Sequence, residues 1–172
     1  MKNIVLVGFM GGGKTSVGKS IRDTLKMRLV NTDDLIEKKE GMSIAGIFAK
    51  KGESYFRKLE REIVKEISKS ENSIIDTGGG VVINEDNVKD LKKNGLIFCL
   101  NATPEEILRR TKRYVHRPLL NVDDPLTEIK ELLNKRKEYY KRADYQIDTN
   151  GKSIEEVAKE IIEIYKRQEK IN

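Results

Sequence analysis

The sequence has few of the features that would tie it to an oxidising compartment or to a membrane. It contains one cysteine, Cys99, so no disulfide can form within the chain, and we expect this thiol to be a small buried side chain. No stretch approaches the roughly 20 apolar residues of a membrane span. The apolar run after Met1 is too short for a secretory signal. We therefore expect a cytoplasmic protein that does not use a membrane.

Tryptophan is absent, and His116 is the only histidine, whereas lysine and arginine outnumber aspartate and glutamate by 34 to 28. The resulting net charge of +6 indicates an anionic partner. Nucleic acid is disfavoured because no aromatic residues are interleaved with a basic stripe. A nucleotide-dependent switch protein that acts on nucleic acid is kept as the alternative from another functional class. A small anionic molecule is the partner that we favour.

Strand patterns and helical patterns alternate along the chain, and there are no repeats or Pro-rich linkers. Five short apolar runs are predicted as strands: Asn3–Val7, Leu29–Asn31, Ser73–Ile75, Leu96–Leu100 and Tyr145–Asp148. The predicted helices are Lys14–Lys26, Asp33–Lys39, Ser43–Lys50, Glu53–Ser68, Asn84–Lys93, one that begins at Pro104, Leu126–Lys141 and Ser153–Lys166, and the tail beyond is expected to fray. This alternation predicts one α/β domain over residues 1–172, with a five-stranded parallel sheet flanked by helices.

A phosphate-binding loop follows the first strand. Gly8–Thr15 reads G-F-M-G-G-G-K-T and fits G-x4-G-K-S/T at every fixed position, between an apolar strand and an amphipathic helix. Glycines let successive N–H groups point at phosphate oxygens, the lysine reaches the β- and γ-phosphates, and the threonine hydroxyl binds Mg²⁺. ATP and Mg²⁺ are therefore the expected ligands. The candidate nucleotide-binding residues are Gly11, Gly12, Gly13, Lys14, Thr15 and Ser16.

Three further features suit a phosphoryl acceptor, although each has an alternative. Asp33 follows the second strand and could orient a hydroxyl; the alternative is that Asp33 or Asp34 simply caps the next helix. Arg57 lies on an amphipathic helix and either binds a carboxylate or is solvated. The glycines Gly78–Gly80 end a strand, where either a turn or a ligand requires close approach to the backbone. The basic segment 112–124 has no regular period and is predicted to be a long functional loop.

Taken together, these motifs resemble the shikimate kinase family over residues 3–150. The loop Gly8–Thr15, with Met10, resembles the family's G-x-M-G-x-G-K-S/T. The resemblance assigns Asp33 to the substrate hydroxyls, Arg57 of F-R-x-x-E to the shikimate carboxylate, and Gly78, Gly79 and Gly80 to the substrate pocket. It also assigns Arg110 to the adenine, Arg117 of R-P-L-L to the transferred phosphate, and Arg136 of R-x-x-x-Y to the same carboxylate.

The resemblance implies a three-layer P-loop kinase fold with an acceptor-binding segment over about 33–61 and a lid over about 112–124. It implies a monomeric enzyme that transfers the γ-phosphate of MgATP to the 3-hydroxyl of shikimate, with Lys14, Asp33 and Arg117 as the catalytic residues. A related kinase of another small hydroxy acid, such as a gluconate-type enzyme, or of a nucleotide is the alternative. The combination of Phe56-Arg57, the triple glycine and Arg-Pro-Leu-Leu argues against it.

The sequence departs from the family pattern at one site position. The first acid of the family's D-x-D element, which helps to position Mg²⁺ through water, is Asn31 here. Asparagine keeps an acceptor oxygen but lacks the charge, so Thr15 and Asn31 are the expected metal-side residues, with weaker attraction for the cation at Asn31. Asp76, two residues before the glycines, is a candidate source of the missing charge.

Overall fold

The computed structural model describes residues 1–111 and 123–171. Its centre is a five-stranded sheet in the order β2-β3-β1-β4-β5, in which every neighbouring pair is parallel. The strands are β1 (Asn3–Val7), β2 (Arg28–Asn31), β3 (Ser73–Asp76), β4 (Gly95–Asn101) and β5 (Tyr145–Asp148). All carboxyl ends therefore lie at one edge, which is where parallel α/β sheets bind ligands.

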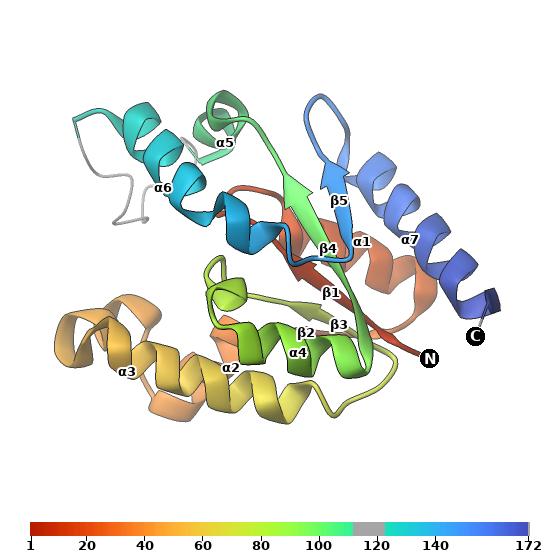
Figure 1. Cartoon of the computed structure of the whole chain (residues 1–172), viewed down its shortest axis with the longest axis horizontal. Coiled ribbons are helices and arrows are strands. Elements are labelled where there is room, and N and C mark those ends of the chain that lie inside the picture. Colours follow the sequence, from red (N-terminus) through yellow and green to blue (C-terminus); the bar gives the residue numbers. More distant parts are fainter. Residues whose placement is uncertain (112–122, 172) are drawn as a thin grey trace.

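Helices cover both faces of this sheet (Figure 1). On one face, α1 (Lys14–Leu25) and α7 (Ile154–Ile171) pack on alternate strand residues such as Ile4, Leu6 and Phe98. On the other face, Val5, Val7 and their neighbours contact four helices. These are α3 (Ile44–Ile67), α4 (Glu85–Lys93), α5 (Pro104–Thr111) and α6 (Pro125–Tyr140). The strands are almost fully buried at the centre because side chains of both faces are covered.

The segment after β2 has a small core of its own. The helix α2 (Thr32–Glu40) and the helix α3 enclose Ile36, Ile47, Phe56 and their neighbours. Gly52 has φ 80° and ψ 171°, which breaks α3 into the two helical segments that the sequence predicts on either side of it. Figure 1 shows the first turns of α3 beyond the carboxyl ends of the strands, beside the site edge.

The observed elements agree with the sequence prediction apart from their ends. Every predicted strand is present, with its bounds within one residue. The reciprocal capping box forms at α7, where the Ser153 amide donates to Glu156 and the Glu156 amide donates to Ser153. The prediction that the chain frays beyond Lys166 is wrong, because α7 continues to Ile171. The short 3-10 helix η1 (Val81–Ile83) was not predicted.

Among residues 1–111 and 123–171, no helix combines the length and the apolar character that crossing a bilayer requires.

Candidate active site

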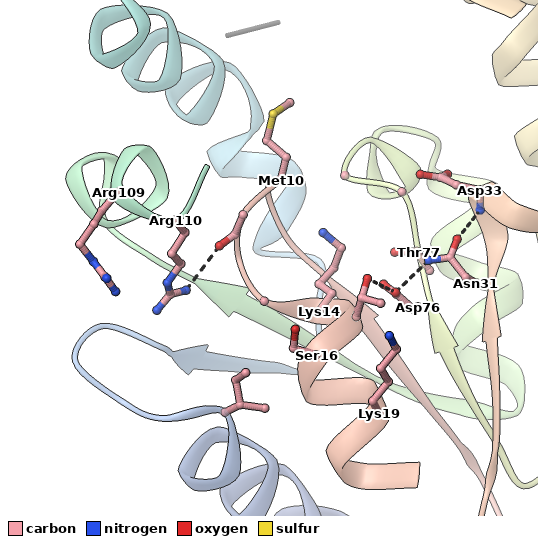
Figure 2. Close-up of a pocket in the computed structure, with 16 residues that line it drawn as sticks. Met10, Lys14, Ser16, Lys19, Asn31, Asp33, Asp76, Thr77, Arg109 and Arg110 are labelled. Carbon is pink, nitrogen blue, oxygen red and sulfur yellow. Dashed lines mark hydrogen bonds between the residues drawn. The ribbon is translucent and has the colours of Figure 1, made fainter. Parts of the chain in front are cut away.

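A cavity of about 650 Å³ opens at the carboxyl ends of β1, β2 and β3. Its wall is formed by the phosphate-binding loop, the first turns of α1, the ends of β2 and β3, and α5, as Figure 2 shows. The lining residues are Met10, Gly11, Gly13, Lys14, Thr15, Ser16, Lys19, Asn31, Asp33, Asp76, Thr77, Gly78, Gly79, Arg109, Arg110 and Ile154. Most of the predicted site residues thus share one cavity.

The loop after β1 has the geometry of a phosphate cradle. Gly11 and Gly13 have φ values of 73° and 89°, which side chains rarely permit. Gly13 is also the N-cap of α1, and it has no side chain that would occupy the first N–H groups of the helix. Those donors, with the positive end of the helix, suit a phosphate. The Lys14 ammonium donates to the carbonyls of Gly8 (2.9 Å) and Phe9 (3.2 Å), so it lies inside the loop.

The side of the cavity next to Thr15 has one buried carboxylate. The Thr15 hydroxyl donates to Asp76 Oδ2 over 2.6 Å, and the Asn31 amide nitrogen donates to the same oxygen over 2.9 Å (Figure 2). The Asn31 oxygen accepts from the backbone amides of Asp33 (2.8 Å) and Asp34 (3.1 Å) and so caps α2. Asn31 therefore presents a donor to this side of the cavity, and not the acceptor that the sequence suggested.

Because the Asn31 side chain caps α2, the Asp33 carboxylate is not needed as the helix cap. The alternative that Asp33 or Asp34 caps α2 is wrong, because Asn31 is the N-cap. Asp33 Oδ1 is buried and has no hydrogen-bond partner among the described residues. Burial raises the pKa of the Asp33 carboxyl above its usual value, although the nearby Lys14 ammonium opposes this shift. The carboxylate faces Gly78, where an added Cβ atom would lie only 2.8 Å from Oδ1.

Arg57 lies against the last glycine of the turn. A Cβ atom at Gly80 would lie 2.6 Å from both terminal nitrogens of its guanidinium. The guanidinium donates to Glu60 Oε2 over 2.9 Å and to Glu53 Oε1 over 3.1 Å. Glu60 is nearly fully buried, and its second oxygen, Oε1, has no partner among the described residues. Burial is the main reason that the pKa of Glu60 is raised, while Arg57 opposes the shift.

Arg136 reaches the same turn from α6. A Cβ atom at Gly79 would lie 3.4 Å from its Nη1, and its guanidinium lies over the Phe9 ring at 5.5 Å from the centroid. One helical turn later, the Tyr140 hydroxyl donates to the Gly79 carbonyl over 2.8 Å, which fixes α6 to the glycine turn. The structure thus brings two arginines that are far apart in sequence to the consecutive glycines Gly79 and Gly80.

Arg110 lies on the opposite side of the cavity, at the end of α5. Its guanidinium donates to the Thr149 hydroxyl (3.0 Å) and carbonyl (2.8 Å), and Nε donates to Glu106 (2.7 Å). It also approaches the Gly11 carbonyl at 3.5 Å, so it joins the phosphate loop to the segment after β5. This position fits a contact with the far end of a nucleotide.

Arg117 and most of the predicted lid over 112–124 lie outside the described residues. Asp124, at the end of that segment, caps α6 by accepting from the amide and the hydroxyl of Thr127.

Sequence reasoning missed some of the cavity wall. Lys19, Thr77 and Ile154 line the cavity and were not singled out. Lys19 lies four residues after Thr15, so helical spacing from the phosphate loop was a usable signal. Ile154 begins α7, far along the chain, and no local pattern connects it to the loop.

Comparison with known proteins agrees with this geometry. A family model described as shikimate kinase matches residues 10–166. The chain belongs to the shikimate kinase family. This result confirms the resemblance seen in the sequence, and with it the assignment to ATP-dependent small-molecule kinases.

Curated relatives and solved structures carry the same description. The shikimate kinase of Caldanaerobacter subterraneus is 54% identical over 131 residues, which is 76% of this chain and 77% of the relative. That of Thermodesulfovibrio yellowstonii is 52% identical over 131 residues, with 76% of each chain covered. The structure of the Acinetobacter baumannii shikimate kinase in complex with shikimate matches with a TM-score of 0.91 and 35% identity, covering 98% of this chain and 94% of that one. The predicted P-loop kinase fold is thereby confirmed.

Proposed function

We propose that this protein transfers the γ-phosphate of ATP to the 3-hydroxyl of shikimate, giving shikimate 3-phosphate and ADP. The proposal applies to this chain the activity for which its relatives are named. One observation in the structure carries it, namely the combination of cations and unpartnered acceptors around Gly78–Gly80.

The two kinds of group around that turn correspond to two parts of one ligand. Arg57 and Arg136 offer fixed guanidinium donors, which suit a carboxylate. Asp33 Oδ1 and Glu60 Oε1 are buried acceptors with no partner in the described part of the chain, and a Cβ atom at Gly78 would contact both. Buried acceptors without donors are costly, so hydroxyl groups of a ligand would relieve them. A hydroxylated organic acid has both features, and shikimate is such an acid.

The residues at the phosphate loop would hold the transferring group. The loop N–H groups and Lys14 would bind the β- and γ-phosphates, and Arg110 would lie beside the adenine. Arg117 would stabilise the charge on the transferring group, and closure of the segment 112–124 would exclude water. The acceptor-binding segment would extend over about 33–61. Asp33 would orient the 3-hydroxyl and take its proton, for which a raised pKa makes a carboxylate the stronger base.

The site also fits Mg²⁺, which prefers oxygen ligands. The Thr15 hydroxyl and the Asp76 carboxylate provide hard oxygen atoms 2.6 Å apart beside the phosphate loop. When bound, the cation would neutralise charge on the β- and γ-phosphates. We further propose that the protein acts as a monomer in the cytoplasm.

The acceptor is tested by measuring ADP release in a coupled assay with ATP and shikimate. Turnover should depend on shikimate. Turnover with gluconate or a nucleoside monophosphate, but not with shikimate, would reject the assigned acceptor.

The role of Arg57 can be tested with a matched control. Arg57→Ala should raise the KM for shikimate strongly and leave the KM for ATP nearly unchanged. Lys58→Ala changes an exposed cation on the same helix and should leave both constants unchanged. An equal loss of affinity for both substrates in Arg57→Ala would contradict the role of Arg57 at the carboxylate.

A further inference from the structure

Asn31 and Asp76 are neighbours across the sheet. They are Cα partners in the parallel register of β2 and β3, and each is the last residue of its strand. The family resemblance places an acid on the metal side at position 31, where this chain has an amide. The carboxylate that the position lacks is therefore found one strand away, at the same height in the sheet.

The orientation of the Asn31 amide is fixed from both sides. Its oxygen accepts from the amides of Asp33 and Asp34, so its nitrogen must point toward Asp76. Asp76 is only 1% exposed, and the oxygen that receives the Asn31 amide also receives the Thr15 hydroxyl. Asp76 is thus held against the P-loop residue that the mechanism assigns to Mg²⁺.

An amide suits position 31 better than a second acid when Asp76 is its neighbour. An aspartate at position 31 would place two carboxylates about as close as the present 2.9 Å contact, and like charges at that distance repel. Asparagine instead donates a hydrogen bond to the carboxylate and still caps the helix, since asparagine and aspartate are equally good N-caps. The two strand ends therefore hold one carboxylate and one amide that donates a hydrogen bond to it.

We propose that Asp76 is the acid on the metal side of the nucleotide site and that Asn31 is the positioning residue that orients it. In P-loop proteins, a strand-end acid commonly cooperates with the loop serine or threonine at Mg²⁺. Asp76 meets that description, because it ends β3 and contacts the Thr15 hydroxyl. Within the described residues, no group of three or more histidine, cysteine, aspartate or glutamate side chains could hold a metal ion. Through its contact with Thr15, Asp76 would act on a metal ion that arrives with the nucleotide.

The inference rests on the proposed function only in that the chain binds a nucleotide. The test measures the affinity for ADP by calorimetry, once with Mg²⁺ and once with EDTA, so that no turnover is needed. In the wild type, Mg²⁺ should strengthen ADP binding. In Asp76→Asn, this gain should fall by about 10- to 100-fold, the usual cost of losing a group that supports a metal site. ADP binding in EDTA should stay within about twofold of the wild type, because the loop N–H groups are untouched.

The exchanged variant gives the sharper comparison. Asn31→Asp combined with Asp76→Asn keeps one carboxylate and one amide but swaps their strands, and it should recover the Mg²⁺ gain to within about fivefold of the wild type. Asn31→Asp alone should lower the melting temperature, because it sets two carboxylates side by side. Asp34→Asn is the control, since it removes an exposed acid three residues from Asn31 and should leave the Mg²⁺ gain unchanged.

Several outcomes would overturn the proposal. The first is that Mg²⁺ strengthens ADP binding to Asp76→Asn as much as to the wild type. The second is that Asp76→Asn weakens ADP binding equally in EDTA, which would indicate a purely structural role. The third is that Mg²⁺ strengthens ADP binding to the exchanged variant no more than to Asp76→Asn. Asp76→Ser is measured in parallel so that the result does not depend on one variant folding. If the wild type shows the Mg²⁺ gain but never phosphorylates shikimate, the proposed function fails while this inference stands.

Discussion

Replacing Gly80 with alanine should move one arginine and nothing else. The added methyl group would lie 2.6 Å from both terminal nitrogens of Arg57 and 2.8 Å from its Cζ, distances at which something must shift. Gly80 has φ −105° and ψ 2°, so alanine strains no backbone there. What moves is the end of a flexible side chain. The folded protein therefore tolerates the change, whereas the guanidinium loses its place beside the turn and its 2.9 Å contact with Glu60.

The size of the effect follows from the bonds that a displaced guanidinium would lose. A hydrogen bond to a charged group contributes about 1.5–3 kcal/mol. Since about 1.4 kcal/mol corresponds to tenfold in an equilibrium constant, losing one such bond to a substrate carboxylate should raise the KM for shikimate by about 10- to 150-fold. The KM for ATP should stay within about twofold, because the turn faces the acceptor. The melting temperature should change by no more than about 2 °C.

A double-mutant cycle separates this mechanism from a direct clash between the methyl group and the substrate. Steady-state kinetics are measured for Gly80→Ala, Arg57→Ala and the double variant. If the methyl group acts through Arg57, it should cost almost nothing once Arg57 is gone, so the two losses should not add. Additive losses, or an equal rise in the KM for ATP, would refute the reasoning, because the glycine would then matter for another reason.

Three further predictions concern other parts of the molecule. Burial raises the pKa of Asp33, so its contribution to stability is present at acidic pH and is lost as the pH rises through that raised value. Asp33→Asn should therefore raise the melting temperature at pH 7 by about 2–4 °C, with a smaller gain at pH 4, as measured by calorimetry. The same variant should abolish turnover, because the proposed base is lost. A lower melting temperature at pH 7 would contradict the stability argument. Arg110→Ala removes the hydrogen bonds to Thr149 and should raise the KM for ATP about tenfold without affecting the KM for shikimate. A rise in the KM for shikimate alone would contradict the assignment of Arg110 to the nucleotide. Cys99 is fully buried and its pKa is raised to about 12, so a thiol reagent should label it only after denaturation, and rapid labelling of the native chain would show that β4 opens.

The sequence was sufficient for the parts of the fold that depend on local pattern. Apolar runs located all five strands, and apolar residues at helical spacing located the helices between them. The phosphate loop was recognisable because its glycines and its Lys14-Thr15 pair occupy fixed positions. The end of α7 was missed because polar residues after Lys166 continue a helix that is already anchored by buried residues such as Tyr165. Propensity alone gives no such information about tertiary support.

The site was harder to predict wherever the choice depended on which atom of a side chain faces which neighbour. The sequence analysis considered only the aspartates as caps of the helix after the second strand, although asparagine is equally favoured there. The structure decides for Asn31, and that single choice frees the Asp33 carboxylate for a ligand and turns the Asn31 nitrogen toward Asp76. A motif such as D-x-D is read along the chain, but a parallel sheet places the last residues of adjacent strands side by side. A charge missing from one strand end can therefore be supplied from the next, and only the register between strands identifies the residue that supplies it.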